Sequence, residues 1–282
     1  MSGTLYLVGT PIGNLGDISV RAAQTLRDVD FIAAEDTRVS RKLLEHLDIK
    51  KPLISYHEHN RIGSGEKILE RLLSGENCAL ISDAGMPAIS DPGEDLVRIC
   101  AEAGVVCTVI PGPCAAVSAL CLSGLPSGRF TFEGFLSTSR KSRNEHLDEL
   151  KTERRTMIFY EAPHKLCRTL HDMLAAFGDR PVSISREITK LFEETKRTTL
   201  SAAADFYDEN PPRGEFVLVI EGLKPEPPTT VTIEDAATVA LGYNDDGMSL
   251  MDAVKKAASE TGIPKNALYD AACKIKKMSP SV

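Results

Sequence analysis

The sequence predicts an α/β protein with two αβ domains and a small C-terminal module of helices. Three observations lead to this prediction. Short apolar segments alternate with amphipathic helical patterns over residues 1–124, a second αβ pattern covers 125–222, and a proline-rich break at 223–231 precedes a helical tail over 232–282. Alternating strand and helix patterns are typical of sheets covered by helices.

The first domain alternates strands with helices. Its expected strands are 5–9, 31–35, 78–82 and 105–110, and its expected helices are 18–29, 39–47, 95–104 and 115–124. The strand segments are apolar on both faces. This favours a parallel sheet with helices on both sides.

The elements of the second domain and of the tail are predicted from the same kinds of pattern. Strands are expected at 131–136, 156–160, 181–188 and 215–222, and helices at 143–151, 164–177 and 200–208. The segment KPEPPTT, residues 224–230, is expected to be a linker. Three short helices are expected in the tail, at 233–241, 249–260 and 264–276. The turn TGIPKNAL makes the last two similar to a helix-turn-helix, with Pro264 suited to a first helical turn.

The composition of the chain argues against several classes of protein. A net charge of −7 argues against a protein that coats nucleic acid nonspecifically. The seven cysteines form no C-x-x-C pair, so we expect reduced thiols and a cytoplasmic protein. No apolar run approaches the roughly 20 residues of a membrane span, and the N-terminus has no signal-peptide pattern.

The first glycine-rich loop, in LYLVGTPIGNLGDIS, is not a phosphate cradle. Its glycines, Gly9, Gly13 and Gly16, match neither G-x-G-x-x-G nor a P-loop, and Pro11 removes a backbone donor. Further Gly/Pro-rich turns follow other strand patterns, in ISDAGMPAISDPG, VIPGPCAAVSALCLSGLP and FYEAPHK. Loops after parallel strands converge on one crevice. Such a crevice suits a ligand with an adenosine and an amino-acid end but no phosphate.

Taken in order, these motifs resemble the tetrapyrrole-methylase superfamily. The resemblance covers about 1–222 and also rests on AAEDTRVSRKLL, SYHEHN, REITKLFEE and RGEFVLVIEG; NALYDAA in the tail resembles the helical module of its RNA-modifying members. It implies two αβ domains of the tetrapyrrole-methylase type with S-adenosylmethionine (SAM) in the cleft between them. It further implies a homodimer and 2′-O-methylation of a cytidine ribose in 16S, small-subunit, ribosomal RNA.

The resemblance also implies which residues bind the cofactor. They are Pro11, Asp83, Ala84, Gly85, Ile89, Ala115, Ala116, Tyr160, Arg186, Glu187, Glu215 and Phe216. Small residues leave room for a flat adenine, aromatic residues supply a wall, and Asp83 suits an ammonium or hydroxyl group.

Methyl transfer to a ribose hydroxyl needs alignment and a nearby base or polarising cation. Candidates cluster in AAEDTR, which contains Glu35, and in SYHEHN, which contains Glu58 and His59. From these clusters Asp36, Arg38 and His57 are taken as catalytic candidates, with the base left unassigned. No metal is expected, because the H-x-H has no matching Cys/His cluster.

With few aromatic residues and no Trp, a single extruded nucleotide fits better than a stacking platform. Phosphate contacts are expected from Arg61, Arg140, Lys141, Arg143 and the tail lysines. Two alternatives stay open: a methyltransferase for corrinoid or porphyrin precursors, and a non-catalytic RNA-binding protein.

Overall fold

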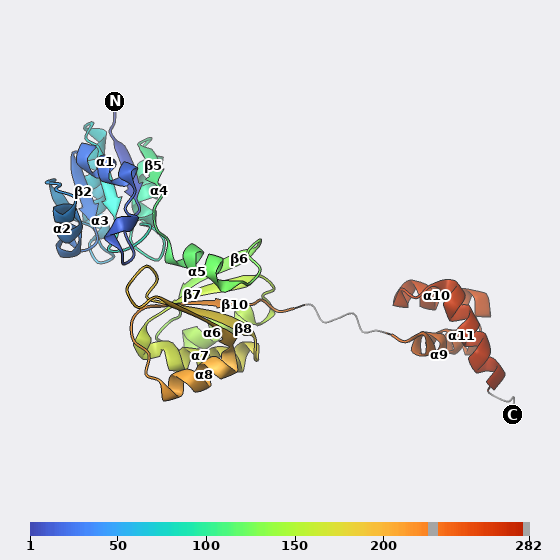
Figure 1. Ribbon diagram of the computed structural model, residues 1–282. Helices are drawn as coiled ribbons and strands as arrows, with labels where there is room; N and C mark the ends of the chain where they lie inside the picture. Colours follow the sequence, from blue (N-terminus) through green and yellow to red (C-terminus); the bar gives the residue numbers. More distant parts are fainter. Residues whose placement is uncertain (225–230, 279–282) are drawn as a thin grey trace. The chain divides into compact units, whose positions relative to one another are not determined.

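The computed structural model describes residues 1–224 and 231–278, and for 277–278 the backbone alone. The chain divides into two compact units, Met1–Leu223 and Lys224–Val282, which are described in turn (Figure 1). The linker expected at 223–231 falls largely on 225–230, outside the described residues, as does the end of the tail, 279–282.

The first sheet is parallel, as predicted. Its strands are β1 (Thr4–Val8), β2 (Phe31–Ala34), β3 (Leu53–Ser55), β4 (Cys78–Ile81) and β5 (Val106–Ile110), in the order β3-β2-β4-β1-β5. Its helices are η1 (Leu15–Asp17, 3-10), α1 (Val20–Asp28), α2 (Thr37–His46), α3 (Arg61–Leu73) and α4 (Glu94–Glu102). Alternate side chains of β2 and β4 enter two separate cores, one with α1 and α2 and one with α3 and α4. Both faces are therefore covered.

Adjacent strands β1 and β4 mark the point where the strand order reverses. The connection after β1 leads past β4 to β2, whereas the connection after β4 leads past β1 to β5. Loops that leave neighbouring strands in opposite directions open a crevice at the carboxyl ends. The fold itself thus places the first glycine loop and the loop after β4 at a ligand-binding position.

The second sheet is mixed. Its strands are β6 (Phe130–Phe135), β7 (Thr156–Glu161), β8 (Pro181–Arg186), β9 (Glu194–Thr199) and β10 (Phe216–Ile220), in the order β6-β7-β10-β8-β9. β6 and β7 are parallel, and the other pairs are antiparallel. Helices α6 (Arg140–Glu149), α7 (Pro163–Phe177) and α8 (Leu200–Glu209), with the 3-10 turn η2 (Leu150–Thr152), lie on one side, and α5 (Ala115–Ser123) lies on the other (Figure 1).

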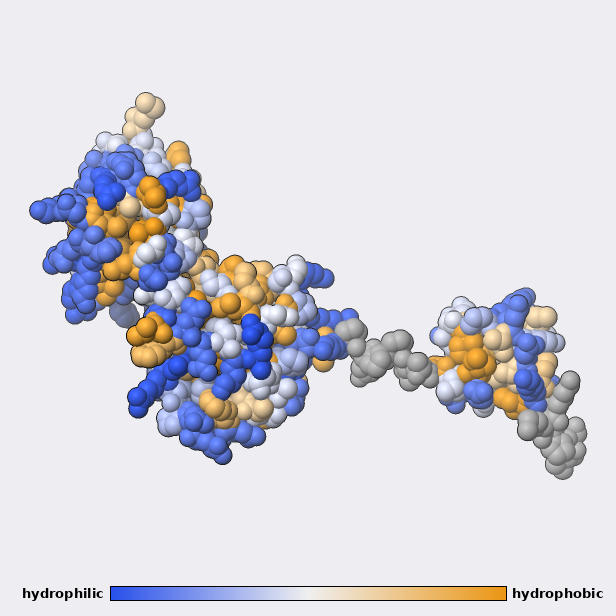
Figure 2. All heavy atoms as spheres, in the orientation of Figure 1, coloured by the Kyte–Doolittle hydropathy of each residue, from blue (hydrophilic) through white to orange (hydrophobic). Residues whose placement is uncertain are grey.

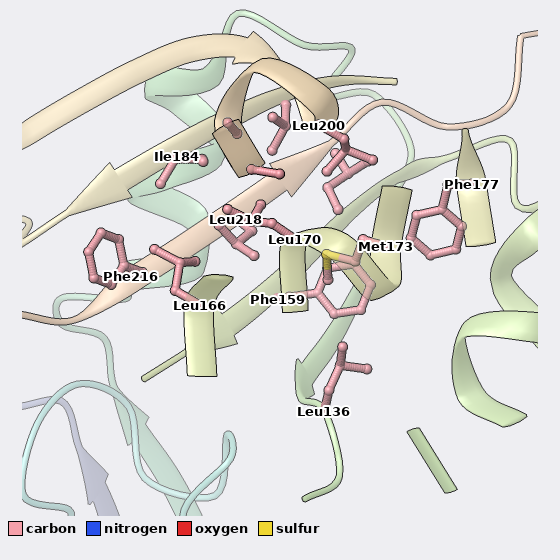
Figure 3. Close-up of a cluster of buried hydrophobic side chains, with 14 of the residues drawn as sticks. Leu136, Phe159, Leu166, Leu170, Met173, Phe177, Ile184, Leu200, Phe216 and Leu218 are labelled. Carbon is pink, nitrogen blue, oxygen red and sulfur yellow. The ribbon is translucent and has the colours of Figure 1, made fainter. Parts of the chain in front are cut away.

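Strand β7 shows how this sheet serves two cores. Met157 and Phe159 join the cluster with α7 and α8, drawn in Figure 3, whereas Ile158 packs with Ala119 and Leu120 of α5. Helix α5 thus packs on the second sheet, although it precedes the domain boundary expected at residue 124. That boundary stays a prediction.

The elements absent from the sequence prediction are β3, α3, β9 and the two 3-10 turns. The start of α3 carries Gly63 and Gly65, which weaken a helical pattern. Strand β9, with the sequence ETKRTT, has no apolar face and pairs along one edge of β8. Strand β9 therefore lacks the hydrophobic periodicity by which the others are recognised, whereas α3 buries Ile68 and Leu72 on one face, a period that could have identified it.

The C-terminal unit consists of the three expected helices, α9 (Ile233–Asp245), α10 (Leu250–Thr261) and α11 (Lys265–Met278). Its core is rich in alanine, which lets the helices approach closely; it comprises Ala236, Ala237, Ala240, Val254, Ala257, Leu268 and Ala272. Gly262 ends α10 with φ of 72°, and Pro264 immediately precedes α11. The turn TGIPKNAL therefore separates α10 from α11, as the sequence predicts.

Candidate active site

A cavity of about 510 Å³ lies at the carboxyl ends of β1, β2 and β4. From the side of the first sheet it is lined by Ile12, Glu35, Asp83, Ala84, Gly85, Met86, Ile89, Ser90, Asp91, Cys114 and Ala115. From the side of the second sheet it is lined by Phe135, Tyr160, Glu161, Ala162, Pro163, Ile188, Glu215, Phe216 and Val217. The cavity sits at the reversal of strand order, where the topology predicts a ligand.

The loop after β4 is held in a strained shape. Gly85 and Thr10 exchange two backbone hydrogen bonds, with N···O distances of 2.9 and 3.1 Å. Ala88 and Ser90 have φ of 68° and 62°. Non-glycine residues in this left-handed region cost roughly 1–3 kcal/mol each and gather at functional sites. The strain lies in the segment that forms most of one cavity wall.

Gly9 has a packing role that explains part of the first glycine loop. A Cβ atom on Gly9 would lie 2.7 Å from Cα of Gly112, and a Cβ on Gly112 would lie 2.9 Å from the Gly9 backbone. Contacts this short are not tolerated between carbon atoms. The two glycines therefore let the chain segments that follow β1 and β5 approach beside the cavity.

Carboxylates dominate the polar lining. Glu35, Asp83, Asp91, Glu161 and Glu215 line the cavity, and no Lys, Arg or His is among the described residues that do. Burial raises the pKa of the Glu35, Asp83 and Asp91 carboxyl groups, and repulsion from neighbouring carboxylates adds to it. An excess of negative charge of this kind attracts a cation and repels phosphate.

The five carboxylates differ in their partners. Asp83 Oδ1 accepts a hydrogen bond from the Asp36 backbone N–H at 3.1 Å. Glu161 accepts from the Ala162 N–H at 2.8 Å and from the Thr169 hydroxyl at 2.6 Å. Glu215 pairs with Lys190 Nζ at 2.9 Å, outside the cavity lining.

Tyr160 forms the aromatic part of the wall. Its hydroxyl accepts a hydrogen bond from the Ala116 N–H at 3.1 Å, at the start of α5. Phe132 and Phe135 approach its ring edge-on, with centroids 5.1 and 5.5 Å away. Burial raises the pKa of Tyr160 to about 12, so its hydroxyl keeps its proton. Tyr160 is rigidly placed by α5 and β6.

Eight of the twelve predicted cofactor residues line this cavity: Asp83, Ala84, Gly85, Ile89, Ala115, Tyr160, Glu215 and Phe216. The other four do not line it. Pro11 precedes the lining residue Ile12, and Ala116 donates to Tyr160. Arg186 pairs with Glu194 at 3.4 Å, and Glu187 binds Lys190 at 2.9 Å. Their cofactor role stays a prediction.

The three catalytic candidates lie outside the cavity lining. Asp36 caps α2 by accepting from the Arg38 N–H at 2.8 Å, and its carboxylate pairs with the Arg38 guanidinium at 2.6 Å. Arg38 holds the pKa of Asp36 well below its usual range. The His57 N–H donates to the Asn60 side chain at 2.9 Å, at the start of α3. Because Arg38 keeps the pKa of Asp36 low, Asp36 is a weak proton acceptor.

The residues predicted to contact RNA differ in how far their side chains are exposed to solvent. The Arg61 and Lys141 side chains are 54% and 86% exposed, with carboxylates 3.8 Å away, and Arg140 is also exposed. Arg143 is buried, with its Nε donating to Asp172 at 2.7 Å and its Nη1 to the Ser137 carbonyl at 3.2 Å. Arg143 thus anchors α6 to α7, and we leave it out of the RNA surface.

Sequence reasoning did not select the other twelve lining residues, among them Asp91, Glu161 and Phe135, and it named Glu35 only as part of a candidate cluster. Asp91 lies in the loop after β4, within ISDAGMPAISDPG, and Glu161 directly follows Tyr160 in FYEAPHK. A carboxylate placed directly after an apolar strand is the signal that could have identified Glu35 and Glu161.

Within residues 1–224 and 231–278, no group of three His, Cys, Asp or Glu side chains is arranged to hold a metal ion. Over the same residues, no helix is both long and apolar enough to cross a membrane.

Fold and cavity together define an α/β protein with a ligand site, suited to a cation, beside the reversal of strand order. Residues 4–204 match the family described as Tetrapyrrole (Corrin/Porphyrin) Methylases, which confirms the resemblance found in the sequence. The chain belongs to the tetrapyrrole methylase family. Residues 244–276, which span α10 and most of α11, match the RsmI C-terminal HTH domain.

Individual relatives are similar over nearly the whole chain. The ribosomal RNA small subunit methyltransferase I of Synechocystis sp. is 47% identical over 268 residues, which are 95% of this chain and 96% of the relative. The protein of the same name from Bacillus subtilis is 45% identical over 276 residues, 95% and 94% of the two chains.

Two solved structures are similar in fold. Diphthine synthase has a TM-score of 0.60 at 14% identity, covering 78% of this chain and 90% of its own. Cobalt precorrin-4 methyltransferase has a TM-score of 0.58 at 18% identity, covering 77% and 94%. At such identities the likeness shows the fold alone.

Proposed function

We propose that this protein transfers the methyl group of SAM to small-subunit, 16S, ribosomal RNA, at the 2′-oxygen of a cytidine ribose. Membership of a methylase family and the names of the near full-length relatives support the reaction and the RNA substrate. The cytidine and the 2′-oxygen are the finer part of the proposal. They come from the motif resemblance.

The lining of the cavity is the observation that carries the proposal. SAM carries positive charge on its sulfonium and its ammonium groups, and five carboxylates without a lysine, arginine or histidine line the described cavity. Opposite charges at a partly buried site attract by several kcal/mol, about 4 kcal/mol at 4 Å. The same lining repels a nucleotide phosphate. When bound, the cofactor supplies an electrophilic methyl group.

Specific side chains suit each part of the cofactor. Asp83 and Asp91 would face the cationic groups, and Ala84, Gly85 and Ala115 leave room for the adenosyl group against the backbone. The aromatic rings that line the cavity are Phe135, Tyr160 and Phe216. The chemistry of this set fits SAM.

The substrate must bring a ribose to an acidic cavity without bringing a phosphate into it. Exposed cations lie outside the lining, on α2 at Arg38, Arg41 and Lys42 and on α6 at Arg140 and Lys141. Figure 2 shows hydrophilic side chains along the outer side of α2. We propose that these groups bind phosphates while one nucleotide is extruded toward the cavity.

Methyl transfer to small ribosomal subunits purified without the modification tests the proposal. Labelled SAM, the subunits and the protein are incubated, and the RNA is digested to nucleosides. We expect label in 2′-O-methylcytidine. Label in another nucleoside would contradict the finer proposal. No transfer to subunits, with transfer to a uroporphyrinogen-type compound, would replace the RNA substrate with a macrocycle.

The homodimer and the cytoplasmic location implied by the resemblance are part of the same proposal. Sedimentation equilibrium tests the first by measuring mass in solution. Fractionation of cells tests the second.

We expect the double variant Arg140→Glu, Lys141→Glu to bind small subunits more weakly and with a flatter salt dependence. Each lost phosphate contact reduces the slope of log K against log salt by about 0.7–0.9. Lys141 lies 3.8 Å from Glu145 but is 86% exposed, so that ion pair is weak and leaves it available. Filter binding at several salt concentrations measures the slope.

The matched control is Arg21→Glu, Arg27→Glu, which reverses two exposed cations on α1, a helix outside the cavity lining. The control should keep the slope. An unchanged slope in the α6 variant would remove Arg140 and Lys141 from the RNA surface.

A further inference from the structure

We infer that Glu35 is the catalytic residue that accepts the proton of the attacking ribose hydroxyl. This inference rests on the proposed function and goes beyond it by selecting one carboxylate. Glu35 directly follows β2 and lines the cavity. Helix α2, with exposed Arg38, Arg41 and Lys42, begins close after it. Glu35 is thus the cavity carboxylate nearest in the chain to the basic surface of α2.

The carboxylate of the neighbouring candidate, Asp36, already has a structural role. Its carboxylate caps α2 and is paired with the Arg38 guanidinium at 2.6 Å, and it does not line the cavity. Arg38 keeps the pKa of Asp36 low, so its conjugate acid gives up a proton readily. A group held ionised in this way gains little by taking a proton from a hydroxyl.

The other cavity carboxylates also have assigned contacts. Both oxygens of Glu161 accept hydrogen bonds, and Glu161 is 3% exposed. Glu215 is 80% exposed and paired with Lys190. Asp83 and Asp91 belong to the loop after β4, where the strand order reverses and where we place the cofactor. Glu35 instead follows β2, which flanks β4 on the side away from β1.

The surroundings of Glu35 favour proton uptake. The charged groups that face it are Asp91, Asp83 and Asp36, all negative. Burial, the largest cause, and these charges together raise the pKa of the Glu35 carboxyl group, against a hydrogen bond from the Asp83 backbone that lowers it. A carboxylate with a raised pKa is a stronger base when it is ionised.

The step balances without any further reactant. The ribose 2′-oxygen forms a bond to the methyl carbon, the carbon–sulfur bond breaks, and its electron pair remains on a sulfur that becomes neutral. The hydroxyl proton passes to a carboxylate oxygen of Glu35. Glu35 then releases that proton to water.

The test compares Glu35→Gln, Glu35→Asp and Asp36→Asn with the unaltered chain, and uses Glu45→Gln as the control. Glu45 is an exposed glutamate on α2, so the control makes the same chemical change outside the cavity. Single-turnover methylation of small subunits at saturating SAM is measured from pH 5 to 9. SAM affinity by calorimetry and the melting temperature of the ligand-free protein are measured in parallel.

For Glu35→Gln we expect the rate to fall by about 10²–10⁴-fold and to lose its rise with pH. The ligand-free variant should melt at a higher temperature at pH 7.5, because a charge repelled by three carboxylates has been removed. Glu35→Asp should keep the rise with pH at a reduced rate. Glu45→Gln should match the unaltered chain throughout.

Two results would overturn the inference while leaving the proposed function intact. One is a Glu35→Gln rate within about tenfold of the unaltered chain with the pH rise retained, since general-base catalysis contributes more than that. The other is loss of the pH rise in Asp36→Asn alone. If the unaltered chain fails to methylate the subunits, the proposed function fails, and the assignment of Glu35 fails with it.

Discussion

Replacing Phe159 by alanine should lower the free energy of unfolding of the αβ unit by about 3–5 kcal/mol. Phe159 is fully buried on β7, between β6 and β10. Figure 3 shows its ring among Leu136, Leu170 and Met173. The cost combines lost apolar burial with a cavity that helices on one side and a sheet on the other cannot close.

Urea unfolding followed by far-UV circular dichroism measures this change, since the chain has no Trp for fluorescence. The matched control is Phe130→Ala, on the edge strand β6, where the ring is 42% exposed. The control should lose far less stability. Equal losses in the two variants would mean that the cluster around Phe159 is not the main core of this half.

Replacing Asp91 by asparagine should weaken SAM binding and stabilise the ligand-free protein. Asp91 contributes one of the five negative charges that line the cavity. Losing it should cost about 1–3 kcal/mol of attraction to a cationic ligand, or roughly 5–150-fold in affinity. Without a ligand, that same charge is half-buried and repelled by Asp83.

The stabilisation should depend on pH, and its sign follows from the pKa. Burial raises the pKa of Asp91 in the folded protein, so the folded state binds the proton more tightly than the unfolded chain. Ionising Asp91 therefore destabilises the fold as pH rises above the ordinary aspartate value of about 4. The asparagine variant should gain most at pH 7–8 and little near pH 4.

Calorimetry with SAM and thermal melts at several pH values test both halves of this prediction. Asp205→Asn, an exposed change on α8, serves as the control and should alter neither quantity. An Asp91 variant with unchanged SAM affinity would remove Asp91 from the cofactor site. A gain in stability that persists at pH 4 would show a cause other than charge.

The residues of the site could be predicted only in part. Eight of the twelve expected cofactor residues line one cavity, because loops after parallel strands must converge. Arg143 was expected to bind RNA, but its partner Asp172 lies 29 residues further along the chain. Asp36 and Glu35 are neighbours in sequence, yet Glu35 lines the cavity and Asp36 binds Arg38. The residue types alone do not show which of two adjacent carboxylates faces a cavity.

The sequence by itself determined the elements that have a strong hydrophobic period. Strands β1, β2 and β4, the covering helices α1, α2 and α4, and the three C-terminal helices follow from local patterns and caps. Only the tertiary structure decided three other features. They are the antiparallel pairing in the second sheet, the polar strand β9, and the packing of α5 on that sheet. Periodicity reports which face of an element is buried, whereas strand pairing, ion pairs and the lining of a cavity depend on residues distant in the chain.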